Sequence, residues 1–170
     1  MAMLTELPAG ASVYIDANIF VYHFTGMSQQ VRTFLSRCER HEVAANAGTL
    51  VLLEVLHRLM VIEARHKGLV SGANPVRQLE QHPDRVRALS EYQFHTQAIP
   101  AMGVHILDLP GDWLTRSLEL RQRYGLLTTD SVIALEMLDH GIPFIASADP
   151  AFDRVPGVTR LAPTDLPFQA

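Results

Sequence analysis

The stretch Val13-Tyr14-Ile15-Asp16-Ala17-Asn18 is a run of apolar β-formers that stops on a carboxylate, with an asparagine two residues later. A short apolar run of this kind predicts a strand that is buried on both faces, as in a parallel sheet. In open α/β sheets, ligands bind beyond the carboxyl ends of the strands, so we expect Asp16 to face a binding site. A single acid in this place proves little, and the rest of the chain decides whether others join it.

Further apolar runs alternate with helical patterns along the chain. Strands are predicted over 43–47, 104–109 and 143–147, with a last edge strand over 158–161. The main helices are predicted over 28–40, 50–65, 112–124 and 131–140. Strands separated by helices of about ten to fifteen residues are typical of βαβ units. The predicted fold class is therefore α/β: one domain over about 10–165, with a mostly parallel central sheet flanked by helices.

Two helical segments have a distinct character. The helix over 50–65, which Thr49 is expected to cap, is apolar nearly all round, and this predicts a buried helix. Residues 64–100 are less apolar, and the pair Asn74-Pro75 predicts a helix start, followed after Pro83 by a second helix over 84–98. The segment is too short to hold a core of its own, so we interpret it as a helical insertion laid on the main body.

Composition excludes several classes of protein. The 170 residues are 48% hydrophobic and 19% charged, which is ordinary for a globular protein and argues against disorder. Cys38 is the only cysteine, so a disulfide framework and a cysteine zinc site are excluded, and a reducing, cytoplasmic location is expected. We see neither a secretion signal nor an apolar run of about 18 residues, so no membrane association is expected.

Three more acids stand where they can join Asp16. Asp149 follows the strand over 143–147, and Asp130 lies at the start of a helix, where the helix dipole favours an anion. Glu54 lies within the apolar helix, where an unpaired carboxylate is costly. Simpler explanations stay open: Asp130 as a capping acid, Asp149 as a turn residue, and Glu54 as an ion-pair partner of Arg58.

Four carboxylates at one sheet edge would repel one another unless a cation joined them. A set of oxygen ligands, with no cysteine and no histidine tied to it by spacing, suits Mg²⁺ or Mn²⁺ better than zinc. A hard dication held by carboxylates suits phosphodiester hydrolysis, because it activates water and neutralises charge on the phosphoryl oxygens. The spacing Glu54-x-x-His57 fits a di-iron helix, but the chain has no second copy of it.

Four stretches in order resemble the PIN-domain ribonucleases, and in particular the VapC-type toxins of bacterial toxin–antitoxin modules. These stretches are 13–18, 52–56, 124–131 and 144–152. The resemblance implies a PIN-like fold and a Mg²⁺- or Mn²⁺-dependent endoribonuclease that hydrolyses RNA phosphodiester bonds as the toxin of a type II toxin–antitoxin pair. It also implies a cognate VapB-type antitoxin and a homodimer.

The resemblance also implies roles for the polar residues. Asp16 and Asp130 would be the principal metal ligands, Glu54 would bind or order a second metal or the attacking water, and Asp149 would complete the acidic pocket. Two further residues match the polar helpers found beside the first and last acids; they are Asn18 and Ser147.

The chain departs from the family pattern in two places. An acid or histidine often stands two residues after the last acid, but here that position is Ala151, and whether Asp153 joins the site is open. The segment 64–100 is longer than in the most compact members.

Two other functions are weighed. A haloacid-dehalogenase-type phosphatase needs a second acid where this chain has Asn18, and its lysine would have to be Lys67. A catalytically inactive PIN-like module that binds RNA or protein usually lacks one of the acids, and all four are present here.

Overall fold

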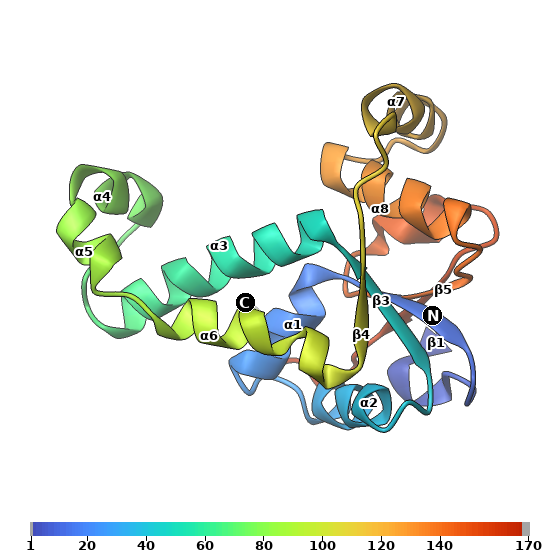
Figure 1. Ribbon diagram of the computed structural model, residues 1–170, viewed down its shortest axis with the longest axis horizontal. Helices are drawn as coiled ribbons and strands as arrows, with labels where there is room; N and C mark the ends of the chain where they lie inside the picture. The colour runs from blue at the N-terminus through green and yellow to red at the C-terminus, as the bar shows by residue number, and fades with distance from the viewer. Residues whose placement is uncertain (1, 168–170) are drawn as a thin grey trace.

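The computed structural model describes residues 2–167 and shows a six-stranded, all-parallel sheet in the order β1-β6-β5-β2-β3-β4 (Figure 1). The strands are β1 Ala2–Met3, β2 Ser12–Ile15, β3 Ala44–Gly48, β4 Val104–Leu107, β5 Phe144–Ala146 and β6 Thr159–Ala162. The α/β class and the parallel sheet are confirmed. The expected edge position of β6 is wrong, because β1, which lies outside the predicted range of 10–165, pairs beside it.

Eight α-helices connect and flank the strands in the described part of the chain. They are α1 Ala17–Phe24, α2 Gln29–Glu39, α3 Thr49–His66, α4 Pro75–Gln81, α5 Pro83–Arg87, α6 Glu91–Ala98, α7 Trp113–Tyr124 and α8 Thr128–Asp139. Helices α7 and α8 pack together on one side of the molecule, and α2 lies on the opposite side (Figure 1). No helix within residues 2–167 combines the length and the apolar character needed to cross a membrane.

The order of the strands places the candidate site. The chain runs from β2 to β3 and β4 on one side, and then returns through β5 and β6 to the other side of β2. Tyr14 of β2 pairs with Asn46 of β3 and with Ile145 of β5, so β2 is central and fully covered. A ligand site is expected where the direction of winding reverses, between the carboxyl ends of β2 and β5. Asp16 comes directly after β2, and Asp149 follows β5 after Ser147 and Ala148.

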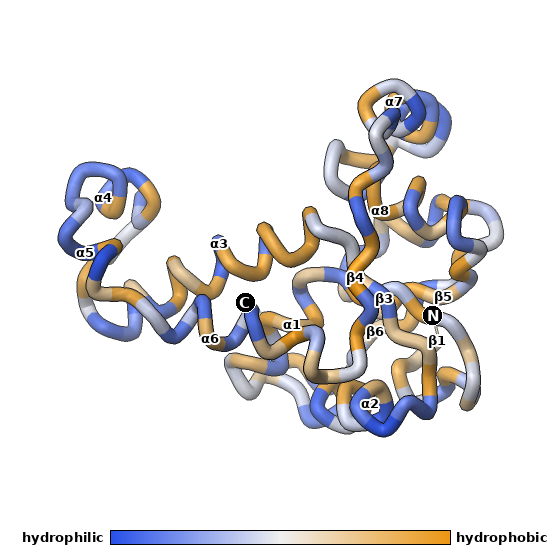
Figure 2. Tube along the Cα trace, viewed as in Figure 1, coloured by the Kyte–Doolittle hydropathy of each residue, from blue (hydrophilic) through white to orange (hydrophobic). Residues whose placement is uncertain are grey.

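Helix α3 is less buried than predicted. Its inner face is covered through Val51, Val55 and Leu59, but Leu53 is 56% exposed. Figure 2 shows hydrophobic residues along much of α3 and mainly hydrophilic ones in α4 and α5. The prediction of a fully buried helix is wrong because the sheet and the neighbouring helices cover only part of its circumference. The expected cap is also different: Gly48 is the N-cap, and the Thr49 hydroxyl donates to the Leu107 carbonyl at 3.1 Å.

The insertion at 64–100 contains three helices, where two were predicted. Helices α4 and α5 lie at the far end of α3, and α6 returns along α3 (Figure 1). The chain turns between α5 and α6 because the buried Glu63 carboxylate of α3 accepts hydrogen bonds from the Ser90 and Tyr92 amides, at 3.0 and 2.9 Å. Lys67 donates to the same carboxylate at 2.6 Å.

Candidate active site

Asp16 ends β2 and is the N-cap of α1, so one residue joins the central strand to the following helix. Its Oδ1 accepts from the Ala17 amide at 2.7 Å, and its Oδ2 accepts from the Ser147 hydroxyl at 2.6 Å and from the Asn18 side-chain amide. Asn18 Oδ1 in turn accepts from the Ala148 amide at 3.2 Å. The two residues predicted to be polar helpers therefore hold the first acid in place and tie the end of β2 to the end of β5.

Asp149 stands beside this network. Its backbone amide donates to the Ser147 hydroxyl at 3.0 Å, and its carboxylate accepts from the Ala151 amide at 2.8 Å as the N-cap of a short 3-10 helix over Pro150–Arg154. Asp149 therefore does act as a turn residue, as the simpler explanation predicts. This role does not remove the residue from the site, because one carboxylate oxygen makes the turn and the other is not used by it.

Asp130 is half-buried in the first turn of α8, as predicted. Burial raises the pKa of its carboxyl group, and the negative charges of Asp149 and Glu54 raise it further, whereas the Leu127 amide and the Arg154 guanidinium lower it. Ala134 of α8 packs with Ala151 and Val155, so the helix that carries Asp130 lies against the segment that follows Asp149.

Glu54 differs from its prediction. The side chain is 40% exposed and forms an ion pair with Arg58 at 3.5 Å, one turn along α3. Glu54 is therefore not an unpaired carboxylate in a buried helix, because its face of α3 is not covered by the sheet. The simpler explanation, an ion pair with Arg58, is confirmed. The charge of Glu54 nevertheless raises the pKa of both Asp16 and Asp130, although less than burial does.

The electrostatics of Asp16 indicate that its surroundings suit a cation. Burial raises the pKa of Asp16 to about 6, against hydrogen bonds from Ser147 and Ala17 that lower it, and the charges of Glu54 and Asp130 add to the rise. A nearby cation would favour the ionised form of such a buried carboxyl group and lower its pKa. Within residues 2–167, no three Asp, Glu, His or Cys side chains converge tightly enough to coordinate one ion by themselves.

This arrangement fits Mg²⁺ or Mn²⁺ better than a metal that needs a closed protein cage. Mg²⁺ usually keeps several waters and binds through one or two carboxylates. Burial raises the pKa of both Asp16 and Asp130, and both are oxygen ligands. Asp149, whose amide donates to the Ser147 hydroxyl that also holds Asp16, is a further oxygen donor.

Asp153, whose membership was open, has a different partner. Its two carboxylate oxygens accept from Arg160 at 2.9 and 2.8 Å, and Arg160 also donates to the Ser147 carbonyl at 3.4 Å. The hydrogen bonds from Arg160, and then its charge, lower the pKa of Asp153. Asp153 thus forms an ion pair with Arg160 of β6, and Arg160 in turn holds the chain just after β5.

Two residues near the site were not predicted from the sequence. Arg154, which donates to the Gly125 carbonyl at 2.8 Å, lowers the pKa of Asp130, and no spacing pattern linked it to that acid. Glu136 is 1% exposed within α8. Like Glu54, Glu136 is a lone carboxylate in an apolar helical run, so the sequence contains the same indication for both residues.

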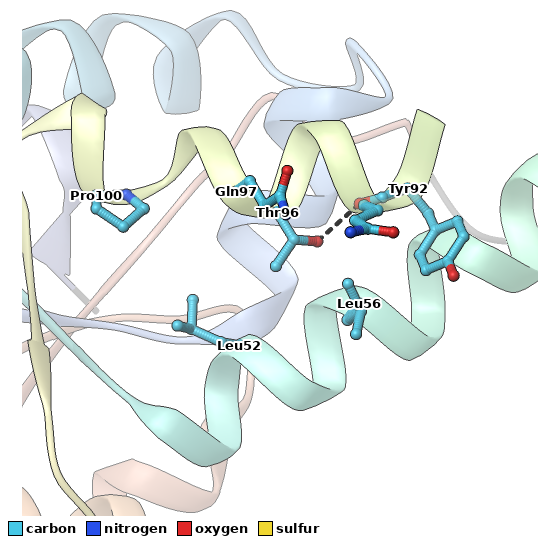
Figure 3. A pocket seen from close by; sticks show the side chains of 7 residues that line it. Leu52, Leu56, Tyr92, Thr96, Gln97 and Pro100 are labelled. Atoms are coloured by element: carbon cyan, nitrogen blue, oxygen red, sulfur yellow. Dashed lines mark hydrogen bonds between the residues drawn. The ribbon is translucent and has the colours of Figure 1, made fainter. Parts of the chain in front are cut away.

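A separate hollow of about 580 Å³ lies between α3 and α6 (Figure 3). Leu52 and Leu56 line its α3 side, and Thr96, whose hydroxyl donates to the Tyr92 carbonyl at 2.9 Å, lies on its α6 side (Figure 3). The remaining lining residues are Tyr92, Gln93, Gln97 and Pro100. No carboxylate lines this hollow, so its surface suits an apolar segment of a protein better than a phosphate or a metal ion.

Comparisons with known proteins agree with the resemblance described above. The family model of the PIN domain matches residues 13–158. Ribonuclease VapC2 of Methanocaldococcus jannaschii is 25% identical over 146 residues, which cover 84% of this chain and 88% of that protein.

Solved structures share the fold. The structure of VapBC2 from Rickettsia felis bound to a promoter DNA fragment matches with a TM-score of 0.60 and 15% identity, over 89% of this chain and 98% of that one. A toxin–antitoxin complex from Klebsiella pneumoniae matches with a TM-score of 0.52 and 18% identity, over 86% and 95%. The family model covers most of the chain, including all four acids, and the chain therefore belongs to the PIN-domain family.

Proposed function

We propose that this protein is a Mg²⁺- or Mn²⁺-dependent endoribonuclease and the toxin of a type II toxin–antitoxin pair. The observation that supports the proposal is the hydrogen-bonded network at the ends of β2 and β5, where the Ser147 hydroxyl joins the Asp16 carboxylate to the Asp149 amide. Burial, with the charges of Glu54 and Asp130, raises the pKa of Asp16 to about 6, which favours a bound cation. The 25% identity to Ribonuclease VapC2 supports the choice of RNA as substrate. Family membership removes the haloacid-dehalogenase-type phosphatase as an alternative.

Each residue has a task in this proposal. Asp16 and Asp130 would hold the metal, while Asn18 and Ser147 keep the Asp16 carboxylate in one orientation through hydrogen bonds. Asp149 would accept a proton or hold a water beside the metal. When bound, the metal would lower the pKa of a water and neutralise charge on the phosphoryl group.

Glu54 would order the attacking water from the α3 side. Its ion pair with Arg58 is long and half exposed, so the carboxylate can turn toward the site at little cost. Arg58, which pairs with Glu54, and Arg154, whose charge lowers the pKa of Asp130, carry guanidinium groups that are well suited to contact RNA phosphates.

The antitoxin is proposed to cover the hollow between α3 and α6. The Rickettsia felis and Klebsiella pneumoniae structures are complexes of a toxin with its antitoxin, which supports a partner of this class. Apolar side chains of α3 and polar side chains of α6 line the hollow, which is open at the surface, so it suits an amphipathic segment of that partner. Homodimer formation stays a prediction, which sedimentation equilibrium measures directly.

The test is cleavage of a defined structured RNA by the purified chain, with Mg²⁺ or Mn²⁺ and with chelator. Asp130→Asn should lower the rate of RNA cleavage by about 100-fold or more, because it removes a charged ligand of the proposed metal. Asp139→Asn is the matched control: it lies on the same helix, pairs with Arg116 at 2.5 Å, and should leave the rate unchanged.

Two results would count against the proposal. Equal cleavage by the wild type and Asp130→Asn in chelator would point to a contaminant or another site. Intact RNA under all conditions, together with Mn²⁺ binding, would favour the inactive binding module.

A further inference from the structure

Tyr14, Gly48 and Glu136 form a buried polar contact behind the acidic site. The Tyr14 hydroxyl donates to Glu136 Oε2 at 2.5 Å and accepts from the Gly48 amide at 2.8 Å. Tyr14 is fully buried, Glu136 is 1% exposed, and Glu136 Oε1 has no hydrogen-bond partner among the described residues. A carboxylate held by one hydrogen bond in a core is a poor source of stability.

Each member of this contact belongs to an element that carries an acid of the site. Tyr14 lies two residues before Asp16 on β2, and Glu136 lies further along the same helix as Asp130. Gly48 ends β3 and caps α3, the helix that carries the third acid. One contact therefore joins the three segments from which Asp16, Asp130 and Glu54 project.

The hydrogen bond between Tyr14 and Glu136 has no substitute. Among residues 2–167 it is the only hydrogen bond that joins α8 to the central sheet, since the inter-element bonds of Ser131 and Asp139 are made with α7. Ile133 also packs α8 into the core, but apolar contacts are non-directional. A hydrogen bond depends on both distance and angle, so it fixes the rotation and height of α8 more tightly.

Gly48 is fitted to the same contact. Its φ of −86° is available to any residue, so the requirement for glycine is spatial. A Cβ atom at this position would lie 2.5 Å from the Tyr14 hydroxyl and closer still to the Glu136 carboxylate. The start of α3 therefore lies directly against the pair.

We propose that Tyr14 and Glu136 are positioning residues that set the place of Asp130 relative to Asp16 in the metal-binding site. The inference rests on the proposed function, because the site that it supports is the acidic one. Neither side chain touches substrate or metal, and both act through the elements that they join.

The test replaces the pair by apolar side chains. Tyr14→Phe/Glu136→Leu should fold, with a urea midpoint somewhat below that of the wild type: both side chains of the buried hydrogen bond are replaced by apolar groups, but the Gly48 amide loses its acceptor. Its Mn²⁺ affinity, measured by calorimetric titration, should fall about tenfold, and RNA cleavage should slow by at least about tenfold, because small displacements of metal-bearing groups are costly.

Two further variants keep the result interpretable. Glu136→Gln retains an oxygen that accepts from Tyr14, so it should keep the wild-type Mn²⁺ affinity. Arg116→Ala/Asp139→Ala removes the ion pair between α7 and α8 and should also leave the Mn²⁺ affinity unchanged, because that pair joins α8 to α7 and not to the strand that carries Asp16.

Wild-type Mn²⁺ affinity in the folded Tyr14→Phe/Glu136→Leu variant would overturn the inference and make the contact a packing feature alone. A loss of affinity in Glu136→Gln equal to that of the double variant would also contradict it. If the wild type binds Mn²⁺ and cleaves no RNA, the proposed function fails, while the affinity comparison still decides the role of Tyr14 and Glu136.

Discussion

Replacing Asp16 by asparagine should change the pH dependence of stability in the metal-free protein. Asp16 is 7% exposed, and its pKa rises from 3.8 to about 6 on folding because burial disfavours the charged form and Glu54 and Asp130 add negative charge. The folded protein thus binds the Asp16 proton more tightly than the unfolded chain. Asp16→Asn removes this proton without changing the size of the side chain.

The sign of the effect follows from the direction of the pKa change. Below pH 3.8, Asp16 is protonated in both states and does not affect the free energy of unfolding through its charge. As the pH rises toward 6, the wild type loses stability, and the loss levels off above that value. At about 1.4 kcal/mol per pKa unit, the full loss is about 3 kcal/mol.

The variant also loses hydrogen bonds, but this cost does not depend on pH. The new amide group would face the side-chain amide of Asn18, which now donates to Asp16. We therefore compare the two proteins at two pH values. Between about pH 4 and about pH 7.5, the free energy of unfolding of Asp16→Asn should gain about 2 to 3 kcal/mol relative to the wild type.

Urea unfolding in chelator, followed by circular dichroism, measures this difference. Asp84→Asn, an exposed Asp on α5, is the matched control and should show almost none of it. Added Mn²⁺ should stabilise the wild type at about pH 7.5 and have much less effect on Asp16→Asn. If the gap between wild type and variant is the same at both pH values, Asp16 does not carry a raised pKa, and our account of the site is mistaken.

Three further predictions concern the framework of the site. Burial opposes the charge of Glu63, but the hydrogen bonds from Lys67 and from backbone amides outweigh burial and lower the pKa of Glu63 to about 2. Glu63→Gln should therefore lower the free energy of unfolding by about 2 kcal/mol near neutral pH. This difference between wild type and variant, read from urea midpoints, should be present above pH 4.5 and disappear as the pH falls toward 2. Gly48→Ala should lower the melting temperature by several degrees, since overpacking costs about 1–3 kcal/mol, and an unchanged melting temperature would refute the fit around Tyr14. Asp165→Ala should cost about 1 kcal/mol in chemical unfolding, because its carboxylate accepts from two amides at the start of α2; a neutral result would mean that solvent replaces it.

The elements that the sequence predicted well depend on local patterns. The apolar run before Asp16 forms the central strand, and Ser28 caps α2 by accepting from the Val31 amide at 3.0 Å. Asp130 lies in the first turn of its helix, as its position before an apolar run indicated. Periodicity and capping act over a few residues, so they are readable before the fold is known.

The α/β class and the parallel sheet could be read from the alternation of apolar runs and helical patterns, and the same runs predicted acids after β2 and β5. Which carboxylates are buried follows only from the packing of distant segments. Glu54 and Glu136 both stand in apolar helical runs, yet Glu54 is 40% exposed and Glu136 is 1% exposed. The physical reason is that burial depends on which face of a helix meets the sheet and on which distant groups cover it. The partner of Glu136 is Tyr14, more than a hundred residues away along the chain, and no local pattern records that contact.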